Sequence, residues 1–210
     1  MFDFGNANEG QRKAIATAEG PVLITAGPGT GKTYTLVQRA IYLIEECGVK
    51  PESIFIATFT EKAAKELITR ITNELSDRGI VANINEMYIG TFHSLCLRIL
   101  KENLEFTRLR RNYRLLDAFD QQYMVFQNIY RFRNIPEVES ALPNGGAWKQ
   151  SEAICNYVNN LSEELVTPEE LMSDADVSIA ALGQMLKEYR DVLTEGNMMD
   201  FSSIQIEAYH

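Results

Sequence analysis

The sequence contains few of the residues that build disulfide frameworks or metal centres. Only three residues are cysteine, Cys47, Cys96 and Cys155, and only two are histidine, His93 and His210. The cysteines are far apart and form no Cys-x-x-Cys pair, which excludes a disulfide scaffold or a zinc site as the basis of the fold. Two histidines cannot supply a multi-histidine metal site by themselves. We therefore expect reduced, buried thiols.

Long apolar runs are also absent. No segment approaches the roughly 18 consecutive apolar residues that a membrane span requires. The first residues, MFDFGNANEGQRK, lack the basic segment followed by an apolar one that marks a secretory leader. Hydrophobic residues make up 45% of the chain and charged residues 23%, values typical of globular proteins. These features predict a cytoplasmic protein with no membrane partner.

Positive charge is scarce and unevenly placed. The net charge is −9, which argues against binding of nucleic acid over the whole surface. Residues 1–114 hold 15 basic and 13 acidic residues, whereas residues 115–210 hold 5 and 16. A polyanion contact is therefore expected in the first half, where a local basic run occurs. This run is either such a contact or a solvated surface, and it consists of Arg98, Lys101, Arg108, Arg110, Arg111 and Arg114.

Short apolar stretches alternate with helical patterns in the first part of the chain. PVLITA, SIFIATF and MYIGTF are typical of β-strands, and each precedes apolar residues at helical spacing. This alternation predicts an α/β fold with a parallel sheet, whose ligands bind at the edge where the strands end. Helical patterns alone follow over residues 107–195. We therefore predict a sheet-bearing part over 1–106, a mostly helical inserted subdomain over 107–195 and a return to the first part over 196–210.

Three segments of the helical region have recognisable boundaries or faces. Residues 120–132 read as one helix that places Tyr123, Phe126, Ile129 and Tyr130 on one side. The sequence TPEE at 167–170 is a capping box with proline at the first helical position. A longer helix is predicted from about 177 to 193, stopping at the Gly-Asn pair that follows.

Residues 26–33, AGPGTGKT, fit the P-loop pattern with alanine in place of its first glycine. The glycines let backbone N–H groups point inward at phosphate oxygens, and the following helix offers its positive end. A lysine in this position reaches the β- and γ-phosphates, and the hydroxyl after it ligates Mg²⁺. The motif therefore predicts ATP or GTP with Mg²⁺, in a P-loop sheet, without choosing among kinases, switches, transporters and motors. Its residues are Ala26, Gly27, Pro28, Gly29, Thr30, Gly31, Lys32 and Thr33.

The next two predicted strands also end in polar residues. Each end combines hydroxyls, the N–H groups of a helix start and one aromatic ring, a set that suits single-stranded nucleic acid. The two phenylalanines are equally consistent with core residues that cap the sheet, and the histidine is more typical of a structural hydrogen-bonding residue. The candidates are Thr58, Phe59, Thr60 and Lys62 after the second strand, and Thr91, Phe92, His93 and Ser94 after the third.

Four motifs in this order resemble a known family. NEGQRKAI, AGPGTGKT, TFTEKAAKEL and GTFHSLCLRIL look like the first motifs of the UvrD, Rep and PcrA group of superfamily 1 DNA helicases. The similarity continues more weakly through RNYRLLDAFDQ and returns at MMDFSSI. It implies a RecA-like first domain with a helical insertion, taken from a protein that translocates on single-stranded DNA and unwinds duplex junctions in replication or repair.

The resemblance also implies roles for single residues. Gln11 would read the adenine, which makes the nucleotide ATP, and Lys32 and Thr33 would serve the phosphates and Mg²⁺. Tyr34 would lie at the nucleotide, where relatives often carry arginine. The two loops of polar residues described above would track single-stranded DNA. The partners implied are single-stranded DNA, duplex junctions and the remaining helicase domains of the parent protein.

An acidic pair at the end of an apolar strand, which would hold the metal ion, is missing. Asp117 and Asp200 are the nearest candidates, and both are better interpreted as helix caps. In the family that the chain resembles, the acidic motif follows shortly after the segment that MMDFSSI matches. We therefore expect a piece cut before that motif, which binds nucleotide and DNA and does not turn ATP over by itself.

Two other classes of protein remain open on the sequence alone. A P-loop kinase or nucleotide switch would transfer or exchange phosphate with no effect of DNA. A non-catalytic interaction module would use the acidic helical half to dock a protein, and Lys32→Ala would leave its behaviour unchanged.

Overall fold

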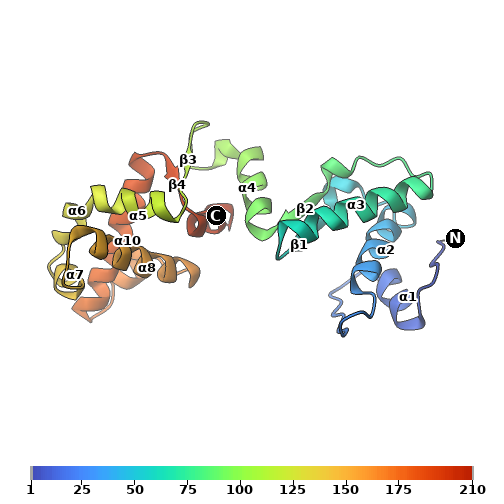
Figure 1. The fold of residues 1–210 in the computed structure, drawn as a ribbon, viewed down its shortest axis with the longest axis horizontal. Coiled ribbons are helices and arrows are strands. Elements are labelled where there is room, and N and C mark those ends of the chain that lie inside the picture. The colour runs from blue at the N-terminus through green and yellow to red at the C-terminus, as the bar shows by residue number, and fades with distance from the viewer. Residues whose placement is uncertain (1, 210) are drawn as a thin grey trace. The chain divides into compact units, whose positions relative to one another are not determined.

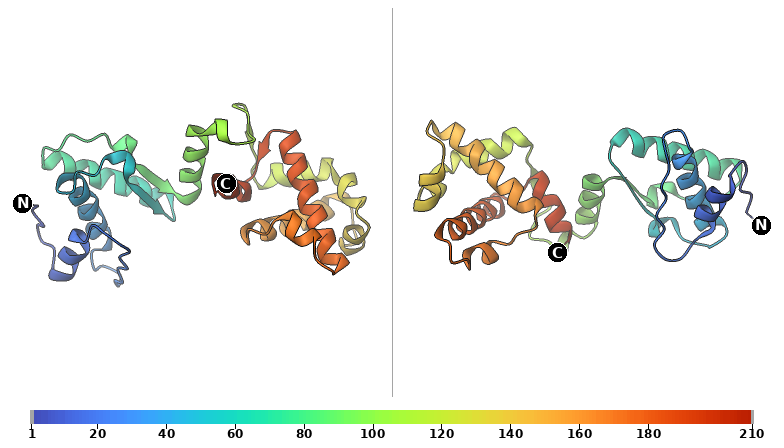
Figure 2. Two further views of the ribbon diagram at one scale, coloured as in Figure 1. Left: turned by 180° about the vertical axis from the view of Figure 1, so that it is seen from behind. Right: turned by 90° about the horizontal axis from the view of Figure 1, so that it is seen from below.

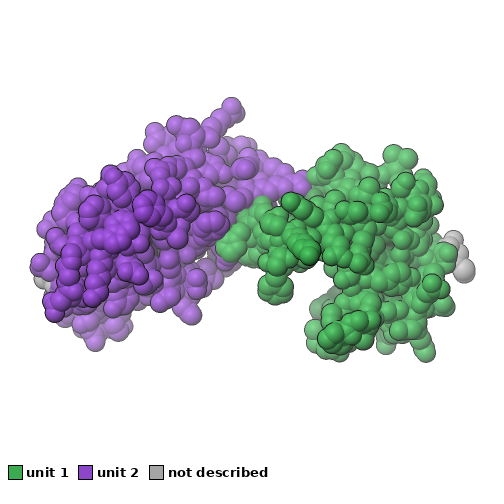
Figure 3. All heavy atoms as spheres, in the orientation of Figure 1, with its two compact units in different colours: residues 1–95 green, residues 96–210 purple. Residues whose placement is uncertain are grey.

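Helices account for most of the chain in the computed structural model, which describes residues 2–209 (Figure 1). His210 lies outside the described residues. The chain folds into two compact units, one up to Leu95 and one from Cys96 onward (Figure 3). This mostly helical structure with a small parallel sheet agrees in class with an α/β protein that carries a helical subdomain.

The first unit contains the small parallel sheet. Its elements are α1 (Glu9–Ala16), α2 (Lys32–Glu45), β1 (Phe55–Thr58), α3 (Glu61–Asp77) and β2 (Tyr88–Thr91), with 3-10 turns at Pro51–Ser53 and Ile84–Glu86. The strands pair in parallel from Phe55 opposite Tyr88 to Thr58 opposite Thr91. The predicted strands in SIFIATF and MYIGTF, and their parallel direction, are thus confirmed.

Helix α3 packs along both strands and against α2 (Figures 1 and 2). It begins at an N-cap, in which the Thr60 hydroxyl accepts the N–H of Ala63 at 3.2 Å. This bond satisfies one of the N–H groups that have no acceptor within the helix. Its buried residues recur at helical spacing and join the core of the first unit, as the sequence pattern indicates. They are Ala64, Leu67, Ile71 and Leu75.

The strand predicted at PVLITA is not formed. Residues 21–27 have no regular secondary structure, and Leu23 is 90% exposed while Val22 and Ile24 are partly exposed. A strand exists only through hydrogen bonds to a neighbour, and β1 and β2 pair only with each other in the described part of the chain. The apolar composition of this segment is correct for a buried strand, but no described strand covers it.

The second unit is a helical assembly around its own core. Its elements are α4 (Phe92–Glu102, which crosses the boundary between units), β3 (Arg114–Leu115), α5 (Ala118–Gln127), α6 (Ile129–Arg133), α7 (Pro136–Ala141), α8 (Ala147–Glu163), α9 (Pro168–Met172), α10 (Val177–Glu195), β4 (Met198–Met199) and α11 (Phe201–Tyr209), with a 3-10 turn at Leu104–Phe106. Helix α10 contacts α6, α7, α8 and α9. Strands β3 and β4 form a two-residue parallel pair that the sequence pattern did not predict.

Local signals placed the ends of α9 and α10 correctly. Thr167 and Glu170 form the predicted capping box, in which the Glu170 N–H donates to Thr167 Oγ1 at 3.2 Å. Helix α10 ends at Glu195 with Gly196 as its C-cap, and Asn197 follows with a φ of 50°, in the left-handed region that asparagine tolerates.

The predicted single helix over 120–132 is wrong, because it breaks at Asn128. The Asn128 side chain donates to the Met124 carbonyl at 2.9 Å, a local bond that competes with continuation of the helix. The side with Tyr123, Phe126 and Tyr130 lies outward, while Gln121, Met124, Val125 and Phe132 are buried. Phe119, Tyr123 and Phe126 stack in sequence at this surface, and Trp148 packs against Phe119 at a tilt and against Phe126 edge-on, with ring centroids 5.6–6.3 Å apart.

The three thiols differ in exposure. Cys96 and Cys155 are buried as expected, whereas Cys47 is exposed. Burial, together with the Asp200 carboxylate, raises the pKa of the Cys155 thiol to about 12, and burial also raises the pKa of Cys96. Since the thiolate is the reactive form, two effects slow the reaction of these thiols with reagents: burial blocks access, and the raised pKa keeps the thiol protonated.

We expect a thiol reagent such as DTNB to modify only Cys47 rapidly in the native chain at pH 8. All three cysteines should react after denaturation, and Cys47→Ser should remove the fast phase. Raising the pH by one unit should still leave Cys155 unmodified on the time scale of the fast phase, because its pKa is raised to about 12. Stoichiometric fast reaction of a second thiol would contradict the packing described here.

None of the helices within residues 2–209 combines the length and the apolar character that crossing a membrane requires.

Candidate nucleotide and nucleic-acid site

The loop before α2 has the backbone shape of a phosphate cradle. Gly29 and Gly31 adopt φ angles of 76° and 84°, in the left-handed region that glycine enters without strain. A Cβ added at Gly31 would lie 2.8 Å from Gln11 Nε2, so the close approach also requires glycine. Gly31 is the N-cap of α2, and no side chain caps that helix. Its first N–H groups are thus available to an anion.

Lys32 folds back over this loop. Its Nζ donates to the carbonyls of Ala26 at 2.8 Å and Gly27 at 3.1 Å. Thr30 Oγ1 donates to the same Gly27 carbonyl at 2.8 Å, which tightens the turn. The ammonium group is therefore held against the carbonyls of this loop.

Gln11 reaches the same loop from α1. Its Oε1 accepts the Asn8 N–H at 2.9 Å in a capping box, and its Nε2 donates to the Thr30 carbonyl at 3.1 Å. A cavity of about 770 Å³ lies between α1, residues 21–27 and the loop, and both Gln11 and Lys32 line it. The two residues assigned to the base and to the phosphates thus face one cavity.

Tyr34 and Pro28 lie elsewhere. The Tyr34 hydroxyl donates to the Phe4 carbonyl at 3.0 Å, and its ring packs into the core of the first unit. Pro28 is exposed. Neither residue lines the cavity that Gln11 and Lys32 share.

A second cavity, of about 330 Å³, joins the P-loop to the end of β1. Lys32 and Thr33 line it on one side and Thr58, Phe59 and Thr60 on the other. The structure brings these two loops together beside the end of β1, although the strand that was predicted to lead into the P-loop is not formed. Lys32 lines both cavities.

Hydroxyl groups connect the loops that follow β1 and β2. Thr58 Oγ1 donates to the Gly90 carbonyl at 3.3 Å, and Thr91 Oγ1 donates to Glu61 at 3.1 Å. Thr91 Oγ1 also accepts the Ser94 N–H at 3.3 Å, so it caps the start of α4. Glu61 was missed by the sequence reasoning, although its place in the first turn after a strand end was a usable signal.

Both phenylalanines of these loops are exposed. Phe59 is fully exposed and Phe92 is 52% exposed, so neither caps the core of the described structure. Lys62 is exposed beside Phe59 on the first turn of α3, and His93 is half-buried. Exposed rings next to hydroxyls are suited to stacking on bases.

The two candidate carboxylates of the metal site are helix caps, as predicted. Asp117 Oδ1 accepts the Asp120 N–H at 2.8 Å at the start of α5. Asp200 Oδ1 accepts the Ser203 N–H at 2.7 Å at the start of α11. Within residues 2–209 no group of three or more histidine, cysteine, aspartate or glutamate residues could hold a metal ion. The one residue that the sequence assigned to the metal is Thr33, which is exposed in the first turn of α2.

Two known proteins are similar in sequence to nearly the whole chain. The chain is 32% identical over 200 residues to the ATP-dependent DNA helicase PcrA of Staphylococcus epidermidis, an alignment that covers 95% of this chain and 25% of that protein. It is 30% identical over 198 residues to the ATP-dependent DNA helicase PcrA of Staphylococcus aureus, covering 94% and 25%. The chain thus spans about a quarter of the length of these relatives.

A family model extends over nearly the whole chain. It describes the UvrD/REP helicase N-terminal domain and matches residues 7–210. The match includes the P-loop, both polar loops and the helical unit. This chain therefore belongs to the UvrD/REP helicase N-terminal domain family.

Proposed function

We propose that this chain is the ATP-binding part of an ATP-dependent DNA helicase that moves on single-stranded DNA and unwinds duplex junctions in replication or repair. The observation that carries the proposal is the placement of Lys32 between two cavities. One cavity is lined by Gln11 and by part of the P-loop, namely Ala26, Gly27 and Thr30, and the other is lined by Thr58, Phe59 and Thr60. A nucleotide on the P-loop would therefore lie next to a loop that suits single-stranded DNA.

The residues fit ATP at its three parts. Gln11 Nε2 donates hydrogen bonds and would face the adenine, the glycine-rich backbone would receive the phosphates, and Lys32 would neutralise their charge. Thr33 would supply one ligand to Mg²⁺, which when bound would neutralise and orient the β- and γ-phosphates. The uncapped start of α2 adds the positive end of a helix to the same place.

The DNA contacts of the proposal use both loops at the strand ends. Phe59 and Phe92 would stack on bases, and the hydroxyls and N–H groups of Thr58, Thr91 and Ser94 would hold phosphates. Thr60, Lys62 and His93 complete the set of candidate residues.

The organisation of the parent protein is part of the same proposal. Residues 1–106 and 196–210 would belong to a RecA-like P-loop sheet, and residues 107–195 to a helical insertion. Further strands of the parent would cover residues 21–26, and the remaining helicase domains would supply the carboxylates and arginines that hydrolysis needs. By itself the chain would bind ATP and hydrolyse it at most slowly. The cytoplasmic location stays a prediction from the sequence.

The proposal is tested by calorimetric titration of the chain with ATP and with GTP in the presence of Mg²⁺, beside Gln11→Glu. Glutamate keeps the carbonyl-type oxygen that the capping box uses and removes the Nε2 donor. We expect the wild type to bind ATP in preference to GTP and Gln11→Glu to lose that preference with its helix content unchanged.

The outcomes separate the competing classes of protein. Equal binding of ATP and GTP by the wild type would contradict the role of Gln11. Phosphate transfer to a small acceptor, with no effect of DNA, would favour a kinase. Rapid DNA-stimulated hydrolysis by this chain would show that a described carboxylate completes the site.

A further inference from the structure

The six cations of the basic run fall into two sets in the structure. Three of them are neutralised by carboxylates. Arg98 pairs with Glu102 at 2.8 Å, and Arg114 pairs with Asp120 at 2.7 Å. Arg108 pairs with Glu207, ninety-nine residues further along the chain. The charges of these three arginines are therefore balanced by carboxylates within the second unit.

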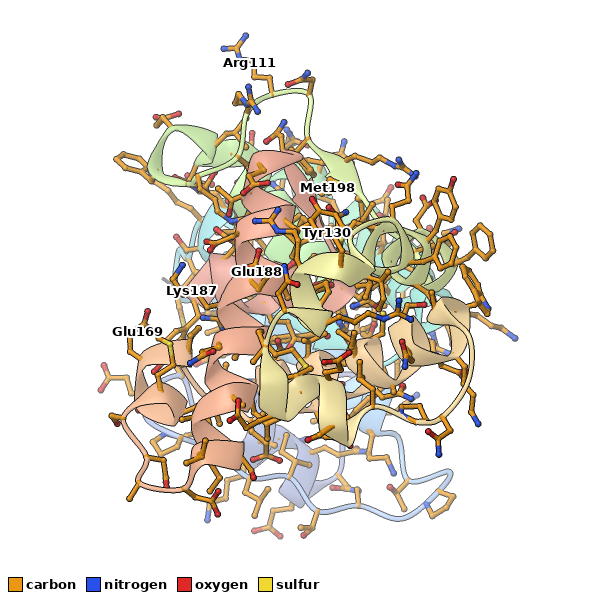
Figure 4. All side chains as sticks on the ribbon, turned by 90° about the vertical axis from the view of Figure 1, so that its left-hand side faces the viewer. Arg111, Tyr130, Glu169, Lys187, Glu188 and Met198 are labelled. Atoms are coloured by element: carbon orange, nitrogen blue, oxygen red, sulfur yellow. The ribbon has the colours of Figure 1, made fainter. Side chains whose placement is uncertain are left out.

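The other three cations gather around a cavity. Lys101, Arg110 and Arg111 are exposed, and in the described part of the chain no ion pair neutralises them. All three line a cavity of about 990 Å³ in the second unit. Figure 4 shows Arg111 on a loop that projects from this unit, with its side chain directed outward. One carboxylate, Glu105, lines the same cavity.

The rest of the lining is apolar. Leu109 is 5% exposed, Leu97, Leu104 and Tyr113 are half-buried, and Leu115 is 37% exposed. The three cations are exposed, whereas Leu97, Leu104, Leu109 and Tyr113 are less exposed, so the cavity combines positive charge with an apolar and aromatic floor. That combination suits a nucleotide unit, which carries a charged phosphate and a flat base.

The loop that carries the arginines is held in place by Asn197. The Arg110 N–H donates to Asn197 Oδ1 at 2.9 Å, and the Arg114 N–H donates to the Asn197 carbonyl at 3.0 Å. Asn197 Nδ2 donates to Asn112 Oδ1 at 3.3 Å, and Asn197 itself is buried. A loop that is already ordered loses less conformational entropy when it binds a ligand.

We propose that this cavity is an additional binding site for single-stranded nucleic acid. Lys101, Arg110 and Arg111 hold the phosphates, and a base rests on the leucine floor against Tyr113. The acidity of residues 115–210 disfavours contact of a polyanion with the rest of the second unit. A duplex can contact the cations through its phosphates, but its bases are paired and stacked and cannot contact the leucines and Tyr113. The inference rests on the proposed function, since it extends the DNA contacts to the second unit.

The test is fluorescence anisotropy with a labelled oligothymidine at several salt concentrations. The variant is Lys101→Ala/Arg110→Ala/Arg111→Ala, and the control Arg98→Ala/Arg114→Ala/Lys187→Ala removes the same charge from positions that are already ion-paired. We expect the variant to bind at least about tenfold more weakly. Its slope of log K against log salt should be smaller by about 2, since each phosphate contact to a single strand contributes about 0.7. The control should keep the wild-type slope.

The floor is tested with Tyr113. Tyr113→Phe should bind the oligothymidine as the wild type does, and Tyr113→Ala should bind it several-fold more weakly. An abasic oligonucleotide should bind both variants equally. Duplex affinity that matches single-strand affinity and ignores Tyr113→Ala would overturn the assignment to single strands.

A variant in the first unit separates this inference from the proposed function. Phe59→Ala/Phe92→Ala should weaken binding if the strand-end loops contact DNA. Weakening by that variant, with an unchanged slope for the cavity variant, would overturn the cavity alone. Absence of any oligonucleotide binding by the wild type would overturn both.

Discussion

Lys32→Ala is expected to lower the affinity of the chain for ATP by at least about 100-fold. Hydrogen bonds to charged groups contribute about 1.5–3 kcal/mol each, and an ammonium group at the β- and γ-phosphates makes two of them. Loss of about 3 kcal/mol corresponds to a factor of roughly 100 in the dissociation constant. The same substitution also removes the bonds from Nζ to the Ala26 and Gly27 carbonyls, which hold the loop closed.

Calorimetric titration with ATP and Mg²⁺ measures this effect, and two variants control it. Lys65→Ala removes an equal charge from an exposed position on α3 and should bind ATP as the wild type does. Lys32→Met keeps the apolar stem of the side chain and should be as defective as Lys32→Ala. Wild-type affinity in Lys32→Ala would mean that the P-loop is structural, which is the prediction of the interaction-module alternative.

Asp200→Ala is expected to lower the free energy of unfolding of the second unit by about 3 kcal/mol. Asp200 is 3% exposed, and its Oδ2 accepts from the Tyr189 hydroxyl and from Gln121 Nε2, the latter at 3.1 Å. Its Oδ1 caps α11 through the Ser203 N–H. Alanine removes both functions. It leaves the buried Tyr189 hydroxyl without its acceptor, at about 1–3 kcal/mol, and removes a cap worth about 1 kcal/mol, while the Gln121 amide keeps Asn159 and Tyr189 as acceptors.

Urea denaturation followed by the fluorescence of Trp148 measures this change. Trp148 is the only tryptophan of the chain and lies in the second unit, so its signal reports that unit even where the two units unfold separately. Tyr189→Phe removes one donor and should cost about 1 kcal/mol. Asp191→Ala, at an exposed ion pair with Lys187, should change stability by less than about 1 kcal/mol. A loss below about 1 kcal/mol for Asp200→Ala would show that the network contributes little.

The candidate site was largely accessible from the sequence because its signals are local. The order glycine, glycine, lysine, threonine before an amphipathic segment predicts the turn and the helix start that the structure contains at Gly31 and Lys32. The proximity of Gln11 to that loop is not a local signal. It depends on the packing of α1 against α2, and the family resemblance supplied it where the pattern alone did not.

The sequence by itself determined the P-loop and the caps at Asp117, Thr167 and Gly196, because each of these depends on neighbours within a few residues. Motifs in their order along the chain indicated the family, and apolar runs indicated the two strands, although their pairing joins distant residues. The tertiary structure decided what depends on distant partners. Residues 21–26 are strand-like in composition, but no described strand pairs with them. Arg108 is neutralised by Glu207 while Arg110 and Arg111 stay exposed, and only the folded chain brings Gln121, Tyr189 and Asp200 together. Pairing across such separations is set by how the elements pack, which periodicity and capping do not encode.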